Sequence, residues 1–143
     1  MPERIAAGAF ILNSGIGKLS ADKERAEHLH GFAKGAYPFL ERMDSQQFTR
    51  ALAFAETALG CALLFPGVGD GLAGLGLAAF AGGLFGLYVR TPGMRREGSV
   101  RPTEAGTTLA KDVWLLGIGL SLLADAGRTR RRRKATQRSK AKP

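Results

Sequence analysis

The sequence predicts an all-α membrane protein, a bundle of four transmembrane helices, and three observations lead to that prediction. Residues 71–89 are nineteen consecutive positions without a charge, long enough to cross the ~30 Å hydrocarbon core of a bilayer as a helix. Three further apolar stretches of similar length lie at 5–21, 48–66 and 108–126. Nine of the 21 lysines and arginines fall within the last sixteen residues, so residues 1–127 are close to neutral and form the predicted membrane domain.

The first predicted span, 5–21, ends near Lys18, whose long side chain can extend its ammonium toward the interface. A cleaved signal peptide is the alternative, but Asn13 and Ser14 interrupt the apolar stretch and no clean cleavage site follows. In the polar segment after this span, apolar side chains recur at helical spacing as far as Pro38. They predict an amphipathic helix that either lies on the membrane surface or caps the bundle: Leu29, Phe32, Ala33, Ala36 and Tyr37.

The second and third spans, 48–66 and 71–89, are joined by a connection so short that they must form an antiparallel hairpin. The third span has a small residue at every fourth position, at Gly74, Ala78, Gly82 and Gly86. Such a ridge favours close approach of another helix in a bilayer.

The fourth span, 108–126, reaches spanning length when Lys111, Asp112 and Asp125 lie at the interfaces, with Trp114 in the aromatic belt. The end of the chain, 128–143, is predicted to be a disordered polybasic tail. Its five consecutive cations, which have no acidic neighbours, favour contact with anionic lipid headgroups: Arg130, Arg131, Arg132, Arg133 and Lys134. Nucleic acid is a poorer fit because no aromatic residue is interleaved for stacking. The same cluster predicts that both termini are cytoplasmic.

Glu56, in the middle of the second span, is the most informative polar residue, because a carboxylate at that depth requires a partner, a proton or water. It predicts an intramembrane polar network drawn from Asn13, Lys18, Glu56, Lys111 and Asp112. Two interpretations of Glu56 stay open: a proton relay or quinone-binding group, and a structural partner for neighbouring helices.

The sequence shows no catalytic motif, so the chain is more typical of a non-enzymatic subunit than of an enzyme acting alone. The single cysteine, Cys61, excludes an intrachain disulfide and a multi-cysteine metal site. His28 and His30 point about 200° apart on a helix, so no metal site is predicted.

Several short motifs resemble the DoxX family of small four-span bacterial membrane proteins. Arg4 precedes the first span, which closes with Gly15-Ile16-Gly17-Lys18, and the second span has Glu56, Gly60 and then Pro66-Gly67. The sequences of residues 88–94 and 110–114 are similar to those of an uncharacterised actinobacterial branch of this family.

This resemblance implies a multi-pass protein of the bacterial plasma membrane that associates with quinol oxidation, thiosulfate:quinone oxidoreduction or thiol-stress complexes. We therefore expect an accessory subunit of a quinone-linked redox complex, with quinone as the candidate cofactor and other redox subunits as partners. The alternative is a membrane interaction or assembly protein with no redox role.

Overall fold

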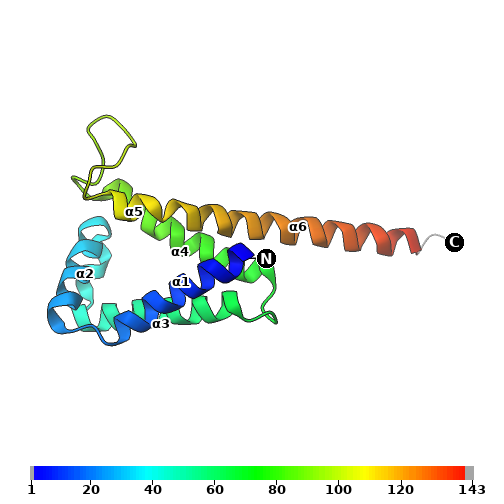
Figure 1. The fold of residues 1–143 in the computed structure, drawn as a ribbon, viewed down its shortest axis with the longest axis horizontal. Coiled ribbons are helices and arrows are strands. Elements are labelled where there is room, and N and C mark those ends of the chain that lie inside the picture. Colours follow the sequence, from blue (N-terminus) through cyan, green and yellow to red (C-terminus); the bar gives the residue numbers. More distant parts are fainter. Residues whose placement is uncertain (1, 141–143) are drawn as a thin grey trace.

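A computed structural model describes residues 2–140, and the regular secondary structure of this part of the chain is all helical (Figure 1). Four long helices are accompanied by one helix of 14 residues and by two helical turns of five residues each. In chain order the elements are α1 (Pro2–Leu19), α2 (Lys23–Ala36), η1 (Pro38–Arg42), α3 (Ser45–Leu64), α4 (Asp70–Arg90), α5 (Thr107–Lys111) and α6 (Val113–Lys140). The all-α prediction is confirmed, and each of the first three predicted spans coincides with most of a helix.

The local sequence explains where the helices begin and end. Asp22 and Asp44 cap α2 and α3, their carboxylates accepting hydrogen bonds from the backbone N–H groups of Arg25 and Gln46. Pro38 follows the end of α2 and Pro66 follows the end of α3, because the residue before a proline is driven out of the helical conformation.

The four long helices run alternately up and down, and they pack as two close pairs, α1 with α3 and α4 with α6 (Figure 1). The N-terminus lies at the same end of the bundle as the α3–α4 turn, and α6 runs past that end. The core joins both pairs: Ala7, Ile11, Leu63, Ala73, Leu77, Ala81, Leu115 and Leu122.

Glycines allow each pair to approach closely. A Cβ on Gly60 of α3 would lie 2.7 Å from backbone atoms of Leu12 on α1. A Cβ on Gly119 of α6 would lie 2.6 Å from the backbone nitrogen of Ala78 on α4. Side chains cannot occupy these positions, so the helix backbones themselves are in contact.

Two helices of the described residues are long and apolar enough to cross a membrane, Asp70–Arg90 and Thr107–Ser139. Their apolar 18-residue stretches have mean hydropathies of 1.8 and 1.3. The second of these helices includes α5 and α6, which are separated by a turn at Asp112. The predicted fourth span therefore has a break near its start.

The prediction of a disordered tail is wrong for residues 128–140, which continue α6 (Figure 1). Arginine, lysine, alanine and glutamine all favour helix, and this stretch has neither glycine nor proline. Extending an existing helix also avoids the cost of nucleating a new one. Residues 141–143 of the predicted tail lie outside the described residues.

Candidate functional site: a pocket beside a buried ion pair

Lys18 of α1 and Glu56 of α3 form an ion pair inside the bundle, with 2.9 Å between Lys18 Nζ and Glu56 Oε2. The side chains are only 13% and 4% exposed. Lys18 also donates to Ser14 Oγ at 2.6 Å, one turn earlier on α1. The close approach of α1 and α3 allows this pairing, because a Cβ on Gly15 would lie 2.7 Å from the backbone nitrogen of Thr57.

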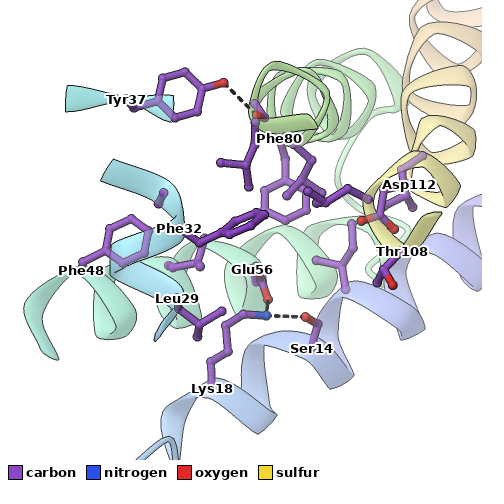
Figure 2. Close-up of a pocket in the computed structure, with 18 of the residues that line it drawn as sticks. Ser14, Lys18, Leu29, Phe32, Tyr37, Phe48, Glu56, Phe80, Thr108 and Asp112 are labelled. Atoms are coloured by element: carbon purple, nitrogen blue, oxygen red, sulfur yellow. Dashed lines mark hydrogen bonds and ion pairs between the residues drawn. The ribbon is translucent and has the colours of Figure 1, made fainter. Parts of the chain in front are cut away.

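The ion pair borders a cavity of about 560 Å³ between the helices (Figure 2). This volume lies within the range of cavities that hold small-molecule ligands, ~300–1,000 Å³. The walls are largely aliphatic and aromatic, and they come from α1, α3 and α4, from the α5–α6 junction and from α2.

The amphipathic helix α2 covers this cavity with its apolar face, through Leu29, Phe32 and Ala33. Tyr37, just after α2, donates its hydroxyl to the carbonyl oxygen of Gly83 on α4 at 2.8 Å and so fastens this cover to the bundle. The amphipathic helix is confirmed, and of the two placements predicted for it, the structure shows the cap on the bundle.

Asp112 lies at the junction of α5 and α6, and its side chain lines the cavity together with Thr108 (Figure 2). Its carboxylate makes no hydrogen bond or ion pair with any residue in the described range 2–140. The cavity therefore contains one neutralised pair and one additional carboxylate.

Of the predicted polar network, the structure brings Lys18, Glu56 and Asp112 to one cavity and leaves Asn13 and Lys111 outside it. Asn13 is exposed because five residues rotate it about 140° away from Lys18 on α1. Lys111 is exposed because neighbouring helical residues point about 100° apart, and Asp112 takes the inward direction. These two assignments are wrong.

The predicted small-residue ridge of α4 does not meet a single partner. Gly74 and Ala78 pack against α6, whereas a Cβ on Gly86 would collide with the Tyr37 hydroxyl. A Cβ on Gly82 would meet no atom of the described chain within 4 Å, so no helix of residues 2–140 packs on Gly82, and packing against a partner stays a prediction. The reason is that positions four apart drift by about 40° around a helix, which turns the ridge away from α6.

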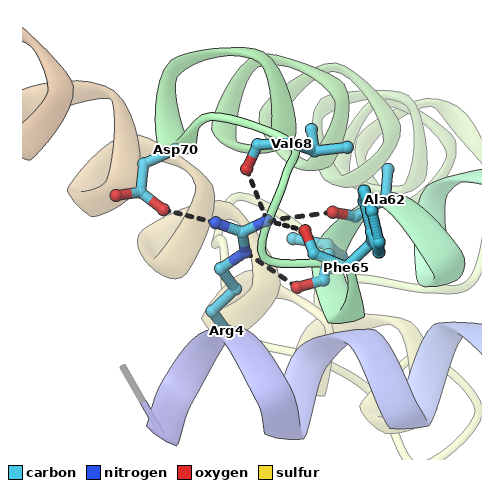
Figure 3. A network of polar contacts seen from close by, with 6 residues as sticks. Arg4, Ala62, Phe65, Val68 and Asp70 are labelled. Atoms are coloured by element: carbon cyan, nitrogen blue, oxygen red, sulfur yellow. Dashed lines mark hydrogen bonds and ion pairs between the residues drawn. The ribbon is translucent and has the colours of Figure 1, made fainter.

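Arg4 forms a polar cluster that the sequence reasoning missed (Figure 3). Its guanidinium pairs with Asp70 Oδ1 at the start of α4, 2.5 Å away. It also donates to carbonyl oxygens at and beyond the end of α3, those of Ala62, Leu63, Phe65 and Val68, over 2.7–3.0 Å. The last carbonyls of a helix have no partner within it, and Arg4 supplies one.

No group of three or more His, Cys, Asp or Glu side chains gathers within residues 2–140 as metal ligands. His30 is buried, and its Nε2 lies 2.8 Å from the carbonyl oxygen of Leu40, which gives the ring a structural partner.

Comparison of the chain with models of protein families, with curated proteins and with solved structures finds no match.

Proposed function

We propose that this chain is an integral membrane protein in which α1, α3, α4 and α6 all cross the bilayer. The support comes from the outward faces of α1 and α3, the two long helices that are not among those apolar enough to span by composition. Between Ile5 and Leu19 the only charged residue is Lys18, and between Ala51 and Leu64 it is Glu56. Since these two charges pair with each other inside the bundle, the outer surfaces of both segments carry no charge.

The exposed apolar side chains on these faces would be unfavourable in water and suit lipid. Ile5 and Phe54 are 59% and 65% exposed on α1 and α3, and Leu72 of α4 is 70% exposed. Apolar side chains thus cover the outside of the bundle as well as its core.

Within this membrane protein, we propose that the cavity beside Lys18 and Glu56 binds a quinone and that the chain is an accessory subunit of a quinone-linked redox complex. A quinone is an apolar ring with two carbonyl acceptors, and when bound it carries electrons and protons for the complex. The ammonium of Lys18 has three N–H groups, of which Ser14 and Glu56 engage two. The third can donate to a carbonyl oxygen of the ring.

The resemblance to the DoxX family supports the same proposal, including a place in the bacterial plasma membrane. The cluster of five consecutive cations from Arg130 to Lys134 favours cytoplasmic termini. The cavity lies in the half of the bundle away from the N-terminus and the α3–α4 turn. In this orientation it therefore belongs to the half of the membrane that faces away from the cytoplasm.

Purification in mild detergent, followed by solvent extraction and mass spectrometry, tests the proposal. We expect a quinone at near-stoichiometric amount, together with copurifying redox subunits. Gly83→Leu adds a side chain to a residue that lines the cavity and should lower the quinone content. Gly82→Leu adds the same side chain to the preceding residue, which does not line the cavity, and should leave the quinone content unchanged.

A wild-type protein that holds no quinone, and that binds none when one is supplied, would rule out the quinone site. Copurification of non-redox membrane proteins in that case would support the alternative, an interaction or assembly role. The exposed glycines on α4 favour this alternative, because Gly82 and Gly83 leave room for a helix from another chain.

A further inference from the structure

The cavity contains a carboxylate that a quinone does not need. Three charged side chains line it, and two of them, Lys18 and Glu56, neutralise each other at 2.9 Å. Asp112 remains as an unneutralised formal negative charge, with no hydrogen-bond or ion-pair partner among residues 2–140. The oxidised form of a quinone offers only acceptor oxygens, so an ionised Asp112 finds no partner in it, although the quinol form would supply O–H donors.

The remaining walls are rich in aromatic rings. Five of them come from four helices and from the segment that follows α2: Phe10, Phe32, Tyr37, Phe48 and Phe80. The face of an aromatic ring carries negative potential and attracts a cation within about 6 Å. Among amphipathic molecules, an aromatic cavity with one surplus carboxylate is therefore complementary to those with a positive charge.

We propose that this cavity is a binding site for hydrophobic organic cations, with Asp112 as the counter-ion and the aromatic walls as the surface that holds the apolar groups. The volume of about 560 Å³ accommodates a drug-sized cation. Desolvation strengthens the attraction between the cation and Asp112, because the field of a carboxylate is screened less between apolar walls than in water. This proposal is independent of whether the protein serves a redox complex.

Tetraphenylphosphonium and triphenylphosphine oxide make a matched pair of probes, since both are bulky aromatic phosphorus compounds and only the first is charged. Binding of each is measured to the full-length protein in mild detergent by equilibrium dialysis. We expect the cation to bind at least about tenfold more tightly than the neutral compound, a difference that one partly desolvated charge pair readily supplies.

Asp112→Asn should abolish this preference while leaving affinity for the neutral compound within about threefold, because the amide keeps the shape and removes the charge. Asp125→Asn is the control, since Asp125 lies further along on α6, pairs with Arg128 and does not line the cavity. Thermal unfolding of both variants shows whether each remains folded.

Equal binding of the two probes, or a preference that survives in a folded Asp112→Asn protein, would overturn the proposal. If Asp112→Asn fails to fold, Gly83→Leu decides the matter: it narrows the cavity, and it must weaken tetraphenylphosphonium binding if the cation occupies this cavity. Cation binding without any quinone binding would reject the proposed redox role and retain this site.

Discussion

One arginine and one lysine of α1 connect this helix to other parts of the bundle. Arg4 joins α1 to the α3–α4 turn, and Lys18 joins the other end of α1 to the middle of α3. Both carry their charge inward to a carboxylate, so the same residues that complete the polar contacts also keep the outer surface apolar. In a bilayer this arrangement avoids the cost of an unpaired ion facing hydrocarbon.

Lys18→Met should destabilise the protein by about 3–5 kcal/mol, because it leaves the Glu56 carboxylate buried without its cation. Combining Lys18→Met with Glu56→Leu should recover most of that loss, since an apolar pair replaces the ions. Thermal unfolding in detergent measures both. The exposed pair Lys23–Glu27, 3.9 Å apart on α2, serves as the control, and its removal should cost less than about 1 kcal/mol. A double variant as unstable as the single one would show that the charges do more than neutralise each other.

Arg4→Lys should lower the free energy of unfolding by about 2–4 kcal/mol although the charge is kept. The loss arises because buried carbonyl acceptors are left without a donor. A lysine ammonium cannot span the carboxylate of Asp70 and the carbonyls at the end of α3 together. Arg50→Lys, at an exposed position on α3, should have no measurable effect. Similar melting temperatures for the two variants would mean that the forked contacts of Arg4 contribute little.

At the scale of elements, sequence reasoning succeeded where a pattern depends on one helix and failed where it depends on the direction in which a helix faces. The four apolar helices follow from composition and length. Lys18 and Glu56 could be expected to meet because few partners exist for a mid-span carboxylate. Asn13 and Lys111 were misplaced, since a rotation of 100° per residue decides which way each side chain points, and only packing fixes that rotation. Arg4 lies 66 positions before Asp70, too far for any local rule to connect them.

Gly119→Leu should destabilise the contact between α4 and α6 by at least about 1–3 kcal/mol, because its side chain must enter the space of the Ala78 backbone. Gly82→Leu is the matched control on α4: its Cβ meets nothing within 4 Å, so the melting temperature should be nearly unchanged. Both substitutions replace a helical glycine with the same better helix former. If the two variants unfold alike, the close approach of α4 and α6 is not a stabilising contact.

The basic extension of α6 should determine how much anionic lipid the protein retains. Replacing the five cations from Arg130 to Lys134 with glutamine keeps helix propensity and removes an attraction of about 1 kcal/mol per charge. Phosphatidylglycerol retained after mild-detergent purification should fall several-fold. Substituting Arg95 and Arg96 in the α4–α5 loop with glutamine should have a smaller effect, because these two are not part of an unbroken cationic run. Unchanged retention in the five-site variant would remove lipid headgroups as the partner of this helix.

On the scale of the whole molecule, the outer faces of the long helices distinguish a membrane bundle from a soluble one. α1 and α3 each bury one face against the other and leave the opposite face free. A soluble bundle would be expected to carry charges on that free face, whereas this one carries alanine, phenylalanine and isoleucine.

A single cysteine placed on that face distinguishes lipid from water. In a Cys61→Ser background, Ala55→Cys lies in the middle of α3 on its exposed side, and Ala135→Cys lies on the basic extension of α6. In sealed inside-out vesicles, whose cytoplasmic face is turned outward, a charged maleimide should label Ala135→Cys and leave Ala55→Cys unmodified, because neither the reagent nor the thiolate is stable in hydrocarbon. Denaturation in sodium dodecyl sulfate should then make both thiols react. Equal labelling of the two positions before denaturation would mean that the outer face of α3 contacts water, and the proposed four-span bundle would be reduced to α4 and α6.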